Sequence, residues 1–187
     1  PHAAIRDSST SRGLGDVYKR QYQGAVFHFL KGFSSGNIGL MVTAEGRMYT
    51  GGSNRGWGSW GTKLDSVERV DWTGKIPFEI HQMRARSDGF ELTFTQPIDP
   101  ASAKPASFSC SAYTYRYSKG YGSPELENVY PEIEVASVAA DGLSLRLKLT
   151  PLTKGHVHEL KVPGLRSTKG LNLLHDTAYY TLNEIPN

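Results

Sequence analysis

Cysteine is almost absent from this 187-residue chain, which holds only Cys110. A single cysteine excludes an intrachain disulfide and any zinc or haem motif built from several cysteines. Long apolar runs are also lacking: the longest patches, such as residues 38–42, have the length of a strand, far below the ~20 residues of a membrane-spanning helix. We therefore expect no membrane span.

The chain also lacks a large excess of charge of either sign, since 21 Lys and Arg and 18 Asp and Glu give a net charge of +3. Beyond the N-terminus the two signs are interspersed, which argues against nucleic acid as a partner. Turn-forming and aromatic residues are abundant instead, with 20 glycines, 10 prolines and 10 tyrosines. Together with a hydrophobic content of 38%, they predict a globular all-β protein.

Sequence motifs of catalysis are missing as well. The chain holds no G-x-S-x-G elbow, no P-loop and no H-E-x-x-H motif. The carboxylates Asp99, Asp141, Glu159 and Asp176 are scattered along the chain, which fits turns and charge pairs better than an acid/base pair held ~5–9 Å apart. We therefore predict no catalytic residue in this chain.

Residues 1–21 match nothing that follows, because they show neither strand alternation nor a helical apolar stripe. They lack the apolar core of a signal peptide. Residues 6–21 closely resemble a segment that recurs in metagenomic translations, where sequencing-adapter DNA has been read as protein; a natural basic tail is the alternative. The first interpretation implies an artefactual or disordered tail and a gene that began upstream, so that residues 22–187 are a fragment.

Residues 22–75 contain four short apolar or alternating runs, which predict four antiparallel strands. The runs are residues 24–30, 37–43, 47–51 and 67–72, with a hairpin-like turn at Glu45-Gly46. Four strands in about fifty residues is the size of one propeller blade. Because a lone blade cannot bury both faces, this interpretation also implies missing neighbouring blades.

A glycine-rich loop at residues 49–61 is the strongest functional lead in this part of the chain, since it combines five glycines with two tryptophans. Asn54 and Arg55 are candidates for contact with a cofactor or an anionic group; alternatively Asn54 holds the turn and Arg55 stacks on Trp57 or pairs with an acidic neighbour. Trp57 and Trp60 are candidates for stacking on a sugar ring, or else plug the junction with the next domain.

Residues 42–58, together with the segment 68–74 (Glu-Arg-Val-Asp-Trp-Thr-Gly), resemble the last blade of bacterial glucose/sorbosone dehydrogenase-like β-propellers. Proteins of this family are typically exported to the periplasm or beyond, and characterised relatives oxidise sugars with pyrroloquinoline quinone (PQQ) and calcium. The catalytic histidine of the family belongs to an earlier blade. The resemblance therefore implies a non-catalytic C-terminal fragment, with PQQ and calcium bound only by a full-length parent.

Residues 76–187 predict a β-sandwich of about seven strands. The cleanest alternation is at residues 143–149, after an Asp141-Gly142 turn, and at residues 90–95. From this alternation we expect seven core residues: Phe90, Leu92, Phe94, Leu143, Leu145, Leu147 and Leu149. The segments 88–101, 141–147 and 158–165 resemble bacterial Ig-like domains of surface-layer proteins, which implies a spacer, adhesive or docking module. Residues 113–131 form a long insertion relative to a plain Ig-like domain.

The insertion is rich in tyrosine. Tyr113, Tyr115 and Tyr117 recur at period two, which places them on one strand face, and Tyr121 follows in a loop. Such a face can stack on glycan rings and hydrogen-bond their hydroxyls; the alternative is a tyrosine ladder that packs on the protein itself. The first interpretation predicts a carbohydrate-binding module.

His156 and His158 lie two residues apart, so both project from one strand face. With His175 or Cys110 they are candidate copper or zinc ligands; the alternative is a solvated strand face.

The sequence as a whole predicts one propeller-type blade followed by an Ig-like sandwich. Its expected function is to close the propeller of an exported sugar-dehydrogenase-like parent and to supply an accessory or docking domain, with the missing blades as partner. A carbohydrate-binding or adhesive extracellular module is the alternative.

Overall fold

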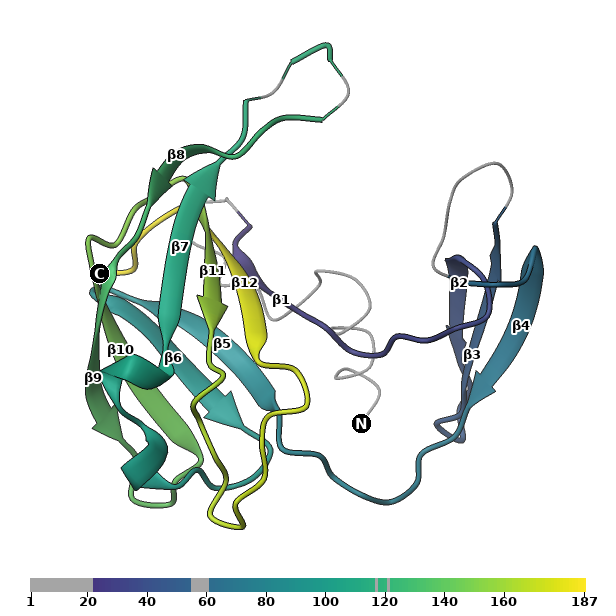
Figure 1. Cartoon of the computed structure of the whole chain (residues 1–187), viewed down its shortest axis with the longest axis horizontal. Coiled ribbons are helices and arrows are strands. Elements are labelled where there is room, and N and C mark those ends of the chain that lie inside the picture. Colours follow the sequence, from purple (N-terminus) through teal and green to yellow (C-terminus); the bar gives the residue numbers. More distant parts are fainter. Residues whose placement is uncertain (1–21, 55–60, 117, 121) are drawn as a thin grey trace. The chain divides into compact units, whose positions relative to one another are not determined.

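The computed structural model describes residues 22–54, 61–116, 118–120 and 122–187. They form two compact units: one spans Phe29–Lys75, and the other joins residues 22–28 to Ile76–Asn187. Within the described residues the regular structure consists of antiparallel strands in three sheets and two short 3-10 turns (Figure 1). The predicted all-β fold class is confirmed.

The larger unit is a sandwich of two sheets, with strand orders β1-β12-β11-β7-β8 and β5-β6-β10-β9 (Figure 1). Apart from β1, these are the orders G-F-C-C′ and A-B-E-D of an Ig-type sandwich. The bounds are β1 Gly24–Phe27, β5 Ile80–Arg86, β6 Gly89–Phe94, β7 Ser109–Thr114, β8 Leu126–Val129, β9 Glu132–Val138, β10 Ser144–Thr150, β11 His156–Lys161 and β12 Thr177–Leu182; η1 Pro100–Ser102 and η2 Pro105–Ser107 connect β6 to β7.

The core lies between the two sheets and holds six of the seven residues expected there: Phe90, Leu92, Phe94, Leu145, Leu147 and Leu149. The prediction for Leu143 is wrong, since its side chain is 38% exposed. Leu143 precedes β10 and lies in the turn, where its backbone N–H donates to the Asp141 carboxylate at 2.9 Å. Alternation therefore indicates burial only as far as the strand itself extends.

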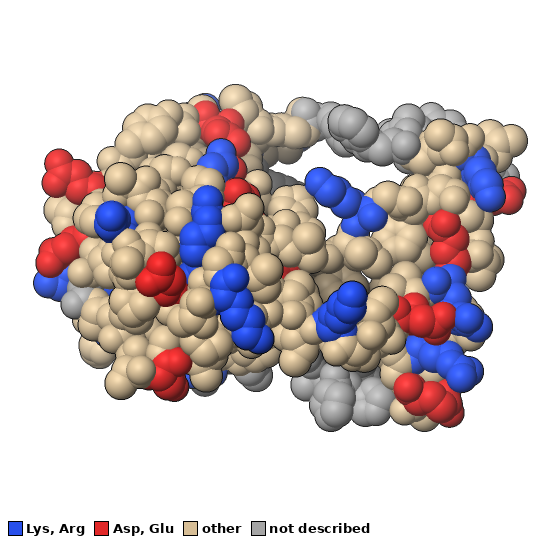
Figure 2. Space-filling model, turned by 60° about the horizontal axis from the view of Figure 1, so that its bottom comes forward, with Lys and Arg blue, Asp and Glu red and all other residues tan. Residues whose placement is uncertain are grey.

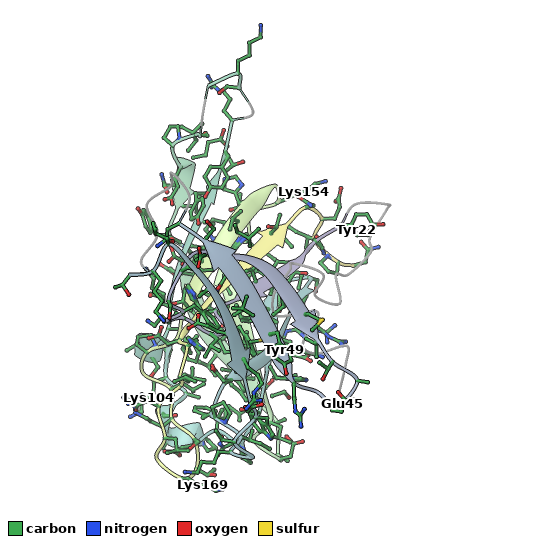
Figure 3. All side chains as sticks on the ribbon, turned by 90° about the vertical axis from the view of Figure 1, so that its right-hand side faces the viewer. Tyr22, Glu45, Tyr49, Lys104, Lys154 and Lys169 are labelled. Carbon is green, nitrogen blue, oxygen red and sulfur yellow. The ribbon has the colours of Figure 1, made fainter. Side chains whose placement is uncertain are left out.

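Two connections meet at one end of the sandwich. The backbone N–H of Asp99 donates to the carbonyl of Arg166 at 2.9 Å, which ties the β6–β7 connection to the β11–β12 connection. Lys104 and Lys169, one from each connection, lie at this end, and Lys154 lies at the opposite end (Figure 3).

The segment expected as an insertion contributes a strand that the sequence analysis missed. Strand β8 pairs with β7 in antiparallel register, with Ala112 opposite Val129 and Thr114 opposite Leu126. Its sequence Leu-Glu-Asn-Val is too short and too polar to stand out as a strand. The tyrosine-rich segment is thus part of the five-stranded sheet.

Strand β1 also differs from the expectation, which placed it in the propeller-type blade. It pairs antiparallel with β12, with Ala25 opposite Tyr180 and Phe27 opposite Ala178, and both β1 side chains pack against the sandwich core. The Gln23 side-chain oxygen accepts two backbone N–H groups just beyond β12, at 3.0 and 2.8 Å. The sandwich edge partly covers Ala25 and Phe27, whereas Val26 stays exposed.

The smaller unit is therefore a sheet of three strands rather than the predicted four. Its order is β2-β3-β4, with bounds β2 Asn37–Val42, β3 Met48–Ser53 and β4 Asp65–Val70. The expected hairpin joins β2 to β3: Gly46 has φ +81°, a left-handed conformation that glycine adopts without strain. Tyr49 of β3 is labelled in Figure 3.

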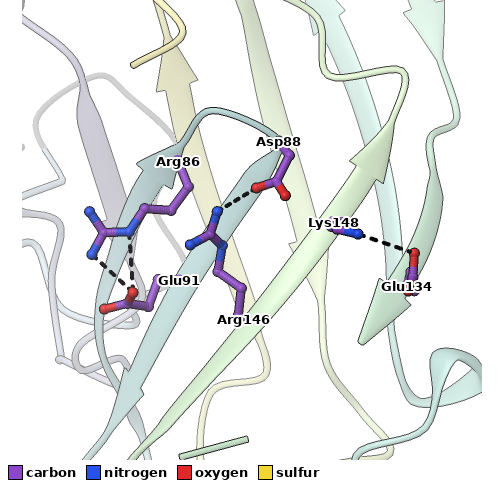
Figure 4. Close-up of polar contacts among 6 residues, drawn as sticks. All are labelled: Arg86, Asp88, Glu91, Glu134, Arg146 and Lys148. Carbon is purple, nitrogen blue, oxygen red and sulfur yellow. Dashed lines mark hydrogen bonds and ion pairs between the residues drawn. The ribbon is translucent and has the colours of Figure 1, made fainter. Parts of the chain in front are cut away.

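The outer face of the four-stranded sheet is a ladder of charged side chains. Arg86 donates to Glu91 at 2.9 Å, Arg146 to Asp88 at 2.5 Å, and Lys148 lies 3.9 Å from Glu134 (Figure 4). Basic and acidic side chains are also interspersed over both parts of the molecule in Figure 2. Solvated ion pairs of this kind contribute little stability each.

None of the helical turns in the described residues is long and apolar enough to cross a membrane.

Candidate functional site on the five-stranded sheet

The outer face of the five-stranded sheet is more varied in chemistry than the charge ladder. Residues directly opposite one another on neighbouring strands share a face, so the pairings of β7, β11 and β12 assign the outward side chains. These side chains combine aromatic rings with hydroxyl, carboxylate and ammonium groups. They are Ser109, Ser111 and Tyr113 of β7, Val157, Glu159 and Lys161 of β11, and Thr177, Tyr179 and Thr181 of β12.

Glu159 is the centre of this outer face. One carboxylate oxygen accepts the Tyr179 hydroxyl at 3.3 Å and lies 3.1 Å from the Lys161 ammonium, and the other accepts the Ser111 hydroxyl at 3.5 Å. Burial and the Glu159 charge together raise the pKa of Tyr179. The Glu159 side chain is only 19% exposed. A carboxylate fixed by three neighbours is a rigid acceptor that needs no ordering when a ligand hydroxyl approaches.

Tyr113 lies diagonally across from Glu159 on the outer face, but Tyr113 and Tyr115 do not form the expected flat ladder. Tyr113 is buried and Tyr115 is 52% exposed, and their rings meet edge to face with centroids 5.5 Å apart. Burial is the main cause that raises the pKa of Tyr113. Strand β7 ends at Thr114, so Tyr115 leaves the strand and its ring is supported from below by Tyr113.

A group of three further side chains continues the outer face beyond Tyr179. The Tyr179 ring meets the His28 ring edge-on at 6.4 Å, and His28 lies 6.1 Å from the His175 ring. The Nδ1–H of His175 donates to Glu79 at 2.7 Å. Burial raises the pKa of Glu79, although its hydrogen bonds with His175 oppose this shift.

Asn54 has a structural role, the alternative that the sequence left open. Its side-chain oxygen accepts the Gly36 N–H at 2.8 Å, and its nitrogen donates to the carbonyls of Gly61 and Lys63 at 3.0 and 2.6 Å. The amide thus joins the two ends of the glycine-rich loop to the segment before β2. A side chain committed to three backbone groups is poorly placed to bind a cofactor.

Five other predicted site residues lie outside the described residues: Arg55, Trp57, Trp60, Tyr117 and Tyr121. Their predicted roles stay predictions.

The structure corrects the predicted metal site at His156 and His158. Both side chains point into the sandwich, where they are 7% and 0% exposed. The His156 ring hydrogen-bonds with two backbone carbonyls. Burial lowers the pKa of His158 to about 4, although a hydrogen bond with the His156 backbone opposes this shift. Burial also raises the pKa of the Cys110 thiol to about 12.

From the sequence, Glu159 is expected only in a turn or a charge pair, which its contact with Lys161 fits, and Tyr179, Lys161 and His28 carry no predicted role. Glu159, Tyr179 and Lys161 come from two strands, and His28 follows a strand that the sequence assigned to the smaller unit. A weak signal exists in β11 and β12, where polar and aromatic residues alternate with buried ones. Such alternation indicates an outward face, but not which strands lie side by side.

No protein-family model and no curated protein matches this sequence. Among solved structures, the chain is similar to the S-layer protein rSbsC(31-844) (24% identity, TM-score 0.45) and to domains 1–6 of the surface layer protein SbsC (24% identity, TM-score 0.42). A third structure, the N-terminal part of SbsC, has 21% identity and a TM-score of 0.42. Each similarity covers 60% of this chain, and 14%, 14% and 25% of the respective SbsC chains.

Proposed function

We propose that the chain is a non-catalytic part of an exported or cell-surface protein, and that its sandwich binds carbohydrate through the outer face of the five-stranded sheet. The observation that carries this proposal is the half-exposed Tyr115 ring, which Tyr113 supports at the end of the same outer face that holds the preorganised Glu159 carboxylate. Glycan recognition needs this combination, because sugars offer apolar ring faces for stacking and hydroxyls for hydrogen bonds.

The electrostatics of the face favour a neutral or hydroxyl-rich ligand. Glu159 is already paired with Lys161, so neither charge is left to attract an ion strongly. The paired groups still present acceptor and donor atoms to sugar hydroxyls. Tyr115 then supplies the apolar contact, and the tyrosine hydroxyls extend the polar rim.

We expect Tyr115→Ala to weaken retention of the full chain by a neutral polysaccharide roughly 2- to 10-fold, since an aromatic contact contributes about 0.5–1.5 kcal/mol. Native affinity electrophoresis through gels that contain different neutral polysaccharides measures the effect. Trp72→Ala is the control, because Trp72 is an aromatic residue that is 66% exposed and belongs to the smaller unit. Equal retention of the wild type and Tyr115→Ala on every gel, or an equal loss for Trp72→Ala, contradicts the proposal.

The three-stranded sheet supports a second proposal, that this unit completes the propeller of a glucose/sorbosone dehydrogenase-like parent. Its apolar side chains are widely exposed, with Ile38 at 79%, Met41 at 58% and Val67 at 82%. A small sheet with apolar groups on both faces requires neighbouring layers. Missing propeller blades are such layers. Because the Asn54 amide is occupied by backbone partners, we assign no PQQ or calcium contact to Asn54.

A longer chain tests this second proposal. We expect a gene extended upstream of Tyr22 to encode further blades, and its product to oxidise aldoses when PQQ and calcium are supplied. This chain alone should show no such activity, because the catalytic histidine of the family belongs to an earlier blade. An upstream sequence without propeller repeats, or an extended protein that remains inactive with PQQ and calcium, contradicts the proposal.

A further inference from the structure

His28 and His175 bring together two ends of the sandwich sheet that are far apart in sequence. His28 directly follows β1, and His175 lies two residues before β12, the strand that pairs with β1. The two imidazole rings are 6.1 Å apart between centroids and inclined by 31°. His28 is exposed, and His175 is largely buried, with a side chain that is 15% exposed.

Glu79 orients the ring of His175. Its carboxylate accepts the backbone N–H of His175 at 3.1 Å and the ring Nδ1–H at 2.7 Å. Both side chains of this pair are mostly buried, at 15% and 18% exposure. With Nδ1 donating, the lone pair of the neutral ring lies on Nε2. A histidine that donates one ring N–H to a carboxylate and presents the other nitrogen is the usual arrangement of a metal ligand.

We propose that His28 and His175 form a two-histidine site for a divalent transition metal of the Zn²⁺, Ni²⁺ or Cu²⁺ type, with Glu79 as the residue that orients His175. A metal bound through ring nitrogens at ~2.1 Å stands roughly 3.2 Å from each ring centroid, so a tetrahedral ion holds two rings roughly 5.3 Å apart. The observed separation of 6.1 Å is longer by less than roughly 1 Å, a difference that a small rotation of the exposed His28 ring removes.

Rotation of the His28 side chain adjusts the angle at the metal. His28 is exposed and stands at the end of its strand, so its rotamer is not fixed by core packing. No three His, Cys, Asp or Glu side chains of the described residues form a group able to hold a metal; water molecules therefore complete the coordination shell of this two-ligand site. Imidazole suits Zn, Ni and Cu, which makes these ions the expected occupants.

A metal bound between His28 and His175 would hold the end of strand β1 against its neighbour β12. This strand has only four residues, and in sequence it is separated from β5 by the whole smaller unit. At its start β1 is held by Gln23, and an ion between His28 and His175 would hold its other end. Because the metal binds the folded sandwich and not the separated strands, it raises thermal stability.

Titration of the full, untagged chain with ZnCl₂ by calorimetry tests the site. We expect one ion per chain in the wild type, at least tenfold weaker binding in His28→Gln and His175→Gln, and 10- to 100-fold weaker binding in Glu79→Gln. His81→Gln is the matched control, since His81 is an exposed histidine on β5. It should bind like the wild type. Zinc should raise the melting temperature of the wild type and His81→Gln but not of His28→Gln.

His28→Gln decides the outcome, because an exposed side chain can be replaced without disturbing the core. Its melting temperature in the presence of a chelator should equal that of the wild type, which confirms an intact fold. The proposal is overturned if the wild type takes up no zinc, if His28→Gln binds zinc as tightly as the wild type, or if His81→Gln loses as much affinity as His28→Gln.

Discussion

Lowering the pH from 7 to 4 will reduce the free energy of unfolding of the sandwich, in part because of His158. The variant His158→Leu will lack the part of this reduction that His158 causes. The His158 side chain is fully buried, and burial lowers its pKa from 6.5 to about 4 against the opposing effect of a backbone hydrogen bond with His156. Between pH ~6.5 and ~4, His158 is therefore protonated in the unfolded chain but neutral in the folded chain. Stability falls until pH ~4, by a total of about 3 kcal/mol from this residue.

Urea unfolding of the wild type and of His158→Leu between pH 4 and 7, followed by far-UV circular dichroism, measures this contribution as the difference between their free energies of unfolding. Other groups also titrate in this range, such as Glu79, whose raised pKa acts in the opposite direction. The comparison of His158→Leu with the wild type cancels them. His81→Leu, a change at an exposed histidine, should keep the wild-type pH dependence. Parallel stability curves for the wild type and His158→Leu would exclude this role of His158.

Phe90→Ala will destabilise the sandwich more than the acid titration of His158, by about 3–5 kcal/mol of unfolding free energy. Phe90 is 0% exposed, and its ring packs against the Tyr180 ring at 5.0 Å and the His158 ring at 5.3 Å. It therefore joins β6 of one sheet to β11 and β12 of the other. Removing the ring leaves a cavity at the centre of the sandwich.

Chemical unfolding followed by circular dichroism measures the loss, because all three tryptophans lie outside residues 76–187 and do not report on the sandwich core. Phe29→Ala is the matched control: Phe29 is 44% exposed, so its removal should change stability by less than about 1 kcal/mol. A second readout is the titration of His158 by NMR, whose pKa should rise as water reaches the cavity. A loss below ~1 kcal/mol for Phe90→Ala contradicts the packing of this ring between the two sheets.

Much of the sandwich could be predicted because its signals are local. The alternation at residues 90–94 and 145–149 identified the core of two strands, and Asp141-Gly142 identified the turn before β10. Strand β8 was missed because its four residues carry no alternation. Leu143 was assigned to the core because the sequence alternation begins before the strand does. The opposite sheet packs only against the strand itself, so Leu143 remains exposed.

The candidate site was less accessible to prediction, for a different reason. The spacing of His156 and His158 correctly placed both on one face, but it did not distinguish the inner from the outer face. The tyrosines at every second position predicted a continuous ladder on one strand face. Strand β7 ends at Thr114, however, so Tyr113 is buried on the sheet whereas Tyr115 lies beyond the strand and is exposed. Side-chain periodicity defines two faces of a strand; the neighbouring sheet decides which of them is buried.

The sequence by itself determined the all-β class, the strand-forming segments and the apolar stripes that fill the sandwich, because these follow from backbone preferences and from a period of two residues. Only the tertiary structure decided that β1 leaves its sequence neighbours and pairs with β12, and that His28, His175 and Glu79 meet. Strand pairing between distant segments depends on the total apolar area buried and on the edges that remain unpaired, and both are properties of the assembled fold.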